Sequence, residues 1–126
     1  MSFEFGPKLN SITTRFSTRD PNNLLNKQGG YIAFVVFSSE LIDQNSVYGD
    51  TLMEKGTECG GSVEVYRTPE EANVRNDYLA LFDGGAFSSG SHTVVGTVIV
   101  RTSYQLTASQ QSALESSIIE ELTSLE

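Results

Sequence analysis

The feature that most constrains the fold is an uninterrupted apolar run, YIAFVVF, at residues 31–37. Its residues are aromatic or β-branched except for one alanine, and its length is that of a strand. A strand with one face in water alternates apolar and polar residues, whereas this run does not alternate. We therefore expect residues 31–37 to form a central strand that is covered on both faces.

Two helices are predicted from their capping signals. Thr68 is a predicted N-cap, Pro69 occupies the first helical position, and Glu71 completes a capping box. This helix is expected to run to about residue 82 and to end at the Asp83-Gly84 pair. Four residues at helical spacing form its expected core-facing side: Val74, Tyr78, Leu81 and Phe82.

The second helix begins at Thr107, where Gln110 is the capping-box partner. Its apolar stripe has helical spacing and is widened by Ile119; the stripe consists of Leu114, Ile118, Leu122 and Leu125. The opposite side of this helix is acidic and rich in serine. We expect the stripe to pack on the sheet and the acidic side to face solvent.

Further strands are predicted at residues 62–66, where apolar and polar residues alternate, and at residues 93–101, a valine-rich run interrupted by Gly96. The polar segment 38–61 between the first two strands is long for a connection, which points to a functional or a flexible segment. The unit 63–101 is then a strand–helix–strand crossover. The predicted fold class is α+β: a two-layer sandwich in which two helices lie on one face of a small mixed sheet, with ferredoxin-like or related topology.

The predicted organisation is an N-terminal arm at residues 1–28 followed by a single domain at residues 29–126. The arm is rich in serine, threonine and asparagine, has a turn signal at Asp20-Pro21, and is expected to be loosely ordered with one short helical piece. Arg15, Phe16 and Arg19 in the arm offer an alternative: they would pack on the acidic body of a second copy and form a homodimer.

Charge restricts the partners of this chain. It has 16 acidic and 8 basic residues and a net charge of −8, and the excess of acidic residues lies after residue 30. Such a field repels nucleic acid and anionic membranes and attracts basic protein surfaces. We therefore expect a protein partner with a basic surface, no direct nucleic-acid binding and no membrane binding. No residue run has the length of a membrane span and the N-terminus lacks a signal-peptide core, so a cytoplasmic location is expected.

Few residues suit catalysis or metal binding. Cys59 and His92 are the single cysteine and the single histidine, so a Cys–His hydrolase would need both. The acidic neighbour Glu58 disfavours a reactive thiolate at Cys59. The glycine-rich segment 83–91 lacks the lysine of a phosphate-binding loop, and the acidic segment 43–54 lacks the central glycine of a calcium loop. We therefore expect no catalytic residue, no cofactor and no metal site.

The partner-binding residues are predicted from charge and from aromatic side chains in polar loops. Aromatic anchors add contact area to electrostatic complementarity. The candidates are Glu115, Glu120 and Glu121 on the last helix, with Tyr48 and Phe87 in loops.

Four segments carry a resemblance to a known type of domain. These are GGYIA at 29–33, VEVYRTPEEA at 63–72, GSHTVVGT at 90–97 and LTASQQ at 106–111. Together they resemble an uncharacterised small domain of proteins from Gram-positive bacteria and their mobile elements, over about residues 29–122. The resemblance implies no activity, cofactor or site residue.

The function expected from these observations is that of a non-enzymatic, acidic, protein-binding protein. It would be an inhibitor of the kind that phages and mobile elements encode, similar to anti-CRISPR proteins, acting on a basic nucleic-acid-binding protein of the host. The first alternative is an accessory recognition domain of a larger or exported bacterial protein. The second alternative is the Cys59–His92 hydrolase.

Overall fold

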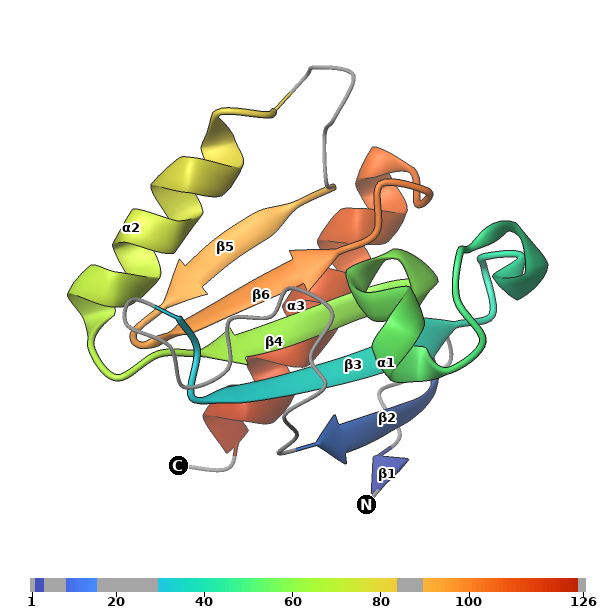
Figure 1. Cartoon of the computed structure of the whole chain (residues 1–126), viewed down its shortest axis with the longest axis horizontal. Coiled ribbons are helices and arrows are strands. Elements are labelled where there is room, and N and C mark those ends of the chain that lie inside the picture. The colour runs from blue at the N-terminus through green and yellow to red at the C-terminus, as the bar shows by residue number, and fades with distance from the viewer. Residues whose placement is uncertain (1, 4–8, 16–29, 84–89, 125–126) are drawn as a thin grey trace.

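The computed structural model describes residues 2–3, 9–15, 30–83 and 90–124. Its centre is a six-stranded sheet with the strand order β1-β2-β3-β4-β6-β5 (Figure 1). The strands are β1 (Ser2–Phe3), β2 (Leu9–Arg15), β3 (Ala33–Ser39), β4 (Gly60–Val65), β5 (His92–Val95) and β6 (Val98–Thr102). Each pair of neighbouring strands in this sheet is antiparallel.

The helical elements connect or follow these strands. The short ones are η1 (Gln44–Ser46), α1 (Leu52–Lys55) and η2 (Gly56–Cys59), all between β3 and β4. The two long helices are α2 (Pro69–Ala80) and α3 (Ala108–Ser124). The Thr68 hydroxyl accepts a hydrogen bond from the Glu71 amide, as the capping box predicts, and the Thr107 hydroxyl does the same for the Gln110 amide.

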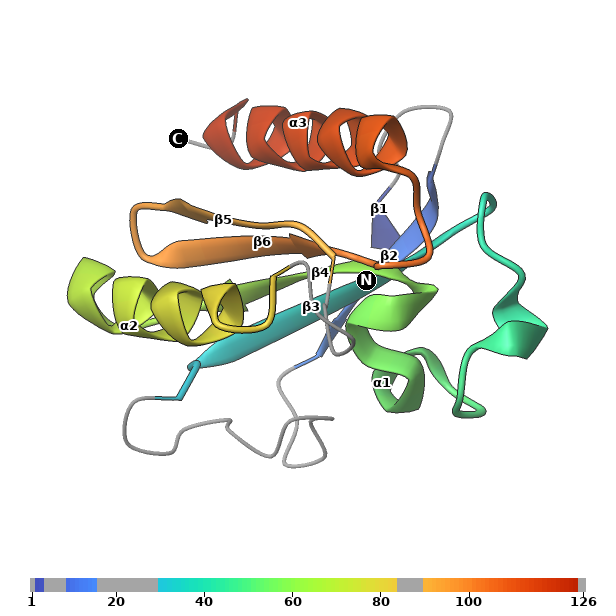
Figure 2. The ribbon, with the colours of Figure 1, turned by 90° about the horizontal axis from the view of Figure 1, so that it is seen from above.

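The sheet is covered on both faces. In Figure 2, α3 lies on one side of the sheet, and α1 and α2 lie on the other. The α+β class is confirmed. The two long helices were expected on one face of a mixed sheet, but they lie on opposite faces of an antiparallel one, and the element order differs from the ferredoxin-like β-α-β-β-α-β.

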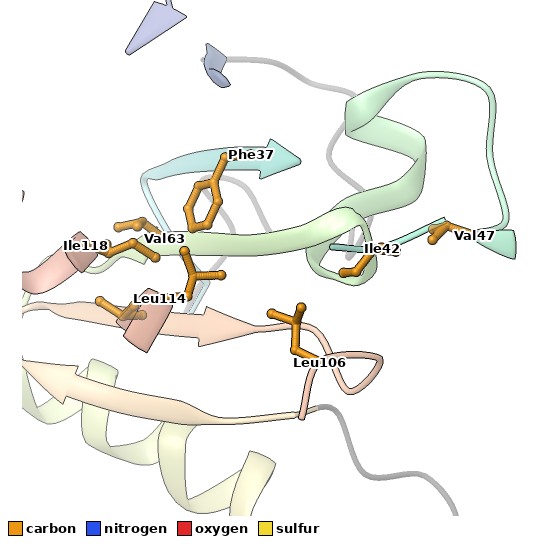
Figure 3. Packing of buried hydrophobic residues seen from close by; sticks show 8 residues of the cluster. Phe37, Ile42, Val47, Val63, Leu106, Leu114 and Ile118 are labelled. Atoms are coloured by element: carbon orange, nitrogen blue, oxygen red, sulfur yellow. The ribbon is translucent and has the colours of Figure 1, made fainter. Parts of the chain in front are cut away.

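The run in β3 explains this layering, because it supplies side chains to both faces. Phe34 and Val36 belong to the apolar cluster under α1 and α2, whereas Phe37 belongs to the cluster under α3. The expectation of a central strand that is covered on both faces is therefore confirmed. The α3 cluster is shown in Figure 3, where Leu114 and Ile118 of α3 lie near Val63 of β4.

The predicted strand at residues 93–101 is instead a hairpin. Gly96 has a φ of 63° and lies in the tight turn between β5 and β6, which pair antiparallel. Glycine adopts this left-handed conformation without steric cost, so the interruption marks a chain reversal rather than a bulge. As a result, α2 connects β4 to the edge strand β5, and β6 returns between them.

The N-terminal segment also differs from its prediction. Residues 9–15 form β2, which pairs antiparallel with β3, and residues 2–3 form β1 beside it. The sheet therefore crosses the predicted boundary between residues 28 and 29, and the described part of the segment is strand rather than a loosely ordered arm. Phe16 and Arg19, named for the homodimer alternative, lie outside the described residues.

The structure differs most from the sequence-based prediction in which side of α2 faces the core. Ala72 and Leu79 are buried against the sheet, whereas Val74, Tyr78 and Leu81 are exposed. The reason is that α2 uses polar side chains on its inner side, where the sheet offers charged partners. By contrast, the stripe predicted for the last helix is confirmed at Leu114, Ile118, Ile119 and Leu122; Leu125 lies outside the described residues.

Candidate functional site

The most concentrated group of ionisable side chains lies around Glu64, between the sheet and α2. Glu64 is in β4 and is completely buried, with 0% of its surface exposed. Its carboxylate accepts hydrogen bonds from Arg101 Nη1 at 3.0 Å, from Arg75 Nε at 3.3 Å and from the Tyr66 hydroxyl at 2.5 Å. We call these four residues the Glu64 cluster.

The sheet register and α2 assemble the Glu64 cluster. Ser62 of β4 is opposite Arg101 of β6, so Arg101 and Glu64 occupy diagonal positions on the same face. Arg75 reaches the same carboxylate from α2. Sequence reasoning missed this cluster, because the alternation at residues 62–66 predicted that Glu64 faces solvent. The covering of the second face by α2 turns that position inward.

Glu58, at the end of η2, extends this charged region. Its side chain interacts with Arg101, Ser103 and the backbone of Tyr104. Burial raises the pKa of Glu58 from 4.5 to about 7, although the nearby Arg101 guanidinium acts in the opposite direction. Oε2 of Glu58 and Nε of Arg101 are both buried without a hydrogen-bond partner.

His92 connects the start of β5 to α2. Its Nδ1 lies 2.6 Å from Oδ1 of Asn76, and its Nε2 lies 2.9 Å from a carboxylate oxygen of Asp83. Asn76 is in α2, and Asp83 follows the end of that helix. Together with Arg75, these contacts fasten the polar inner side of α2 to the sheet.

Cys59 and His92 are not paired in the structure. The Cys59 thiol is buried, and its hydrogen-bond acceptors are the backbone carbonyls of Phe37 and Gly56. Burial raises the pKa of this thiol to about 11, so the thiolate that a cysteine hydrolase requires is disfavoured near neutral pH. Both ring nitrogens of His92 are engaged with Asn76 and Asp83. The geometry therefore gives the hydrolase alternative no support.

The Glu64 cluster changes the charge of the surface. Arg75 and Arg101 both point to Glu64, and Lys55 donates to the backbone carbonyl of Gln44. Within residues 30–83 and 90–124, the only basic side chain classed as exposed is Arg67. The exposed carboxylates in the same ranges are Glu40, Asp43, Asp50, Glu54, Glu70, Asp77, Asp83, Glu120 and Glu121. Over these two ranges the surface is therefore more acidic relative to its cations than their composition alone implies.

The partner-binding residues predicted from the sequence do not form one patch. Glu120 and Glu121 are exposed near the C-terminal end of α3, whereas Glu115 is half-buried and accepts a hydrogen bond from the Thr93 hydroxyl at 2.7 Å. Tyr48 is 95% exposed in the loop between η1 and α1. That loop lies toward the end of the sheet where α3 begins (Figure 2), whereas Glu120 and Glu121 belong to the C-terminal part of α3. Phe87 lies outside the described residues.

The structure also exposes an apolar strip that was not predicted as a binding site. Val74 and Tyr78 of α2, and Leu81 directly after the end of this helix, are 71%, 52% and 78% exposed. The sequence contains these apolar residues at i, i+4 and i+7. This spacing predicts one apolar side of the helix, which was expected to face the core. Periodicity identifies an apolar side of a helix without indicating what covers it.

Comparisons with family models, with curated proteins and with solved structures give no match to this chain. The resemblance to a small domain of Gram-positive bacteria and mobile elements therefore stays a prediction. Among the residues that the structure describes, no three His, Cys, Asp or Glu side chains are grouped to hold a metal ion. The described helices also include none that is both long and apolar enough to cross a bilayer.

Proposed function

We propose that this chain is a non-catalytic, acidic protein that binds a basic surface on another protein. The observation that carries the proposal is the unequal exposure of charge: Arg75 and Arg101 are engaged with Glu64, while carboxylates remain on the outside. A surface of this kind raises the association rate with basic partners and repels acidic ones.

The proposed partner is a host protein that binds nucleic acid. Such proteins concentrate lysine and arginine where they contact phosphates, so an acidic protein competes with nucleic acid for the same surface. The chain would then act as an inhibitor of the kind that phages and mobile elements encode, comparable to an anti-CRISPR protein. A cytoplasmic location belongs to the same proposal, since the nucleic-acid-binding partner is found there.

The proposed contact residues are Glu120 and Glu121, with Tyr48 as a separate aromatic anchor. Glu120 and Glu121 are exposed and adjacent, and neither has a basic partner among the described residues. Glu115 is a weaker candidate, because the Thr93 hydroxyl already occupies one of its oxygens. The alternative function, an accessory recognition domain of a larger or exported protein, predicts that the exposed carboxylates serve solubility only.

Capture from bacterial lysate tests the proposal. The full chain is immobilised, and the bound proteins are identified by mass spectrometry at low and at raised salt. We expect nucleic-acid-binding proteins at low salt and their loss at raised salt. The variant E120Q/E121Q keeps the shape of both side chains and removes their charges, so it should capture less; the control S112A/S116A changes exposed positions on the same helix without changing charge.

The outcome that opposes the proposal is equally specific. Capture that is insensitive to salt and equal for E120Q/E121Q and wild type would assign the carboxylates to solubility. The accessory-domain function would then be the better account.

A further inference from the structure

The outer side of α2 carries an apolar strip formed by Val74, Tyr78 and Leu81, which we call the α2 strip. Their spacing of i, i+4 and i+7 places them along one side of the helix, and each is more than half exposed. The inner side of the same helix is occupied by Ala72 and Leu79, which pack on the sheet. The strip is therefore not a continuation of the core.

Tyr78 at the centre of the α2 strip is held in place by its neighbours. Its ring makes an edge-to-face contact with Phe82, with ring centroids 5.4 Å apart. The guanidinium carbon of Arg75 lies 5.5 Å from the Tyr78 ring centroid, while the Arg75 Nε donates to Glu64. The Glu64 cluster thus fixes the arginine on which an exposed aromatic ring rests. Rigid aromatic anchors of this kind are typical of binding surfaces.

Carboxylates line one side of the α2 strip. Glu70 and Asp77 are exposed and are seven residues apart, the same separation as Val74 and Leu81. Two parallel rows result on the outer side of α2, one apolar and one acidic. An apolar row beside a charged one fits a partner whose own apolar and basic residues run side by side.

We propose that the α2 strip binds an amphipathic basic helix of the partner protein. This inference rests on the proposed function and adds a second contact surface for the same partner, on the face of the sheet opposite to α3. The helix α2 has 12 residues, so its length of about 18 Å matches a partner helix of roughly three turns. Leucine-like side chains at i, i+4 and i+7 would contact Val74, Tyr78 and Leu81, and adjacent lysines or arginines would face Glu70 and Asp77.

A second copy of this chain is a poorer occupant. Pairing two copies of α2 would bring the acidic rows of both copies close together, and the basic side chain on this helix, Arg75, is engaged with Glu64. The charges of α2 therefore favour a basic partner over self-association.

Two synthetic peptides test the inference. One is a leucine–lysine peptide of about 16 residues, long enough for a helix, with all leucines on one side. The other has the same composition in shuffled order, so it carries equal charge without an apolar side. Binding to the full chain is measured by fluorescence anisotropy. We expect the amphipathic peptide to bind roughly tenfold more tightly, because only it can cover the α2 strip.

Variants locate the binding site. V74S/L81S should lower the affinity for the amphipathic peptide to that for the shuffled peptide, whereas Leu41→Ser, at an exposed leucine outside α2, should leave it unchanged. Chemical-shift mapping on the wild-type protein provides a second measurement that needs no variant. The amides of residues 70–81 should show the largest shifts.

The failures of the two proposals are distinguishable. Equal, salt-sensitive binding of both peptides with no effect of V74S/L81S would overturn the inference about α2 and leave the charge-based function standing. No binding of either peptide at low salt would contradict both. A dimer in sedimentation that becomes a monomer in V74S/L81S would assign the strip to a second copy and would also overturn the inference.

Discussion

At the scale of single residues, the contacts of the buried Glu64 also affect the charge of the surface. A carboxylate with no exposed area is stabilised only if its charge is compensated, and here two guanidinium groups and a phenol hydroxyl provide that compensation. The same contacts withdraw Arg75 and Arg101 from the surface. Removing the Glu64 charge would therefore deprive Arg101, itself buried, of the ion pair that it makes with Glu64.

We predict that Glu64→Gln destabilises the protein strongly. Breaking a buried ion pair from one side costs about 3–5 kcal/mol, because the remaining charge is desolvated and unpaired. Urea unfolding followed by circular dichroism measures this cost. The control Glu121→Gln makes the same chemical change at an exposed position, and it should alter the free energy of unfolding by less than about 0.5 kcal/mol. Equal stabilities of the two variants would contradict the description of the Glu64 cluster.

The raised pKa of Glu58 predicts that the free energy of unfolding depends on pH. Its pKa is about 7 in the folded chain and 4.5 as its ordinary value, so between these two pH values the unfolded chain ionises this group and the folded chain does not. The folded state then binds more protons, and its stability falls as pH rises through this range. Below pH 4.5 the carboxyl is neutral in both states, and above about pH 7 it is charged in both.

Glu58→Gln isolates this effect, because glutamine resembles the neutral carboxyl. Relative to wild type, the variant should gain stability progressively from about pH 4.5 to about pH 7, and the gain should then level off. Thermal unfolding at a series of pH values measures the difference. A difference that is constant over this range would show that the folded state does not retain the Glu58 proton.

At the scale of elements, the two long helices behave differently. On α3, apolar periodicity and core contact coincide, since Leu114 and Ile118 are both predicted and buried. On α2 they do not coincide, because the inner side holds Arg75 and Asn76 as well as Leu79, and the apolar periodicity lies on the outside. The helix is attached by polar contacts to Glu64 and His92 as much as by apolar burial.

Two leucines test this orientation of α2. Leu79 is buried and Leu81 is exposed, so Leu79→Ala should cost about 2–5 kcal/mol. Leu81→Ala removes the same atoms from an exposed side chain and should change the free energy of unfolding by less than about 0.5 kcal/mol. Chemical denaturation of both variants measures the two changes in the free energy of unfolding. A larger cost at Leu81 than at Leu79 would mean that the helix is rotated toward the side expected from the sequence.

Much of the element structure could be predicted from local signals. The N-caps at Thr68 and Thr107 and the apolar run of β3 depend on neighbouring residues only, and all three are confirmed. The errors concern long-range arrangement. Strand pairing decides that Gly96 lies in a turn rather than in a bulge and that α2 and α3 lie on opposite faces of the sheet. Single-sequence patterns do not specify that pairing.

The candidate site was harder to predict than the fold. Exposed carboxylates such as Glu120 and Glu121 follow from composition and helix periodicity. The burial of Glu64 does not, because it requires Arg101 from β6 and Arg75 from α2 to meet on one face of β4. The same applies to the α2 strip, whose exposure follows only once the inner side of α2 is known.

At the scale of the whole molecule, the buried charges around Glu64 are compensated, whereas most exposed carboxylates of the described residues are not. The Glu64 cluster holds α2 to the sheet and removes two cations from the surface. In the proposed complex, the exposed carboxylates would attract the partner at long range, and the α2 strip would supply apolar contact at short range. Together these features fit the proposed binding of a basic, nucleic-acid-binding partner.

The most direct test is competition with nucleic acid. A nucleic-acid-binding protein recovered at low salt is loaded with fluorescent DNA or RNA, and the purified chain is titrated into the complex. The account predicts release of the nucleic acid, with a half-effective concentration that rises with salt and rises further for E120Q/E121Q. Nucleic acid that stays bound at saturating concentrations of the chain would contradict the account.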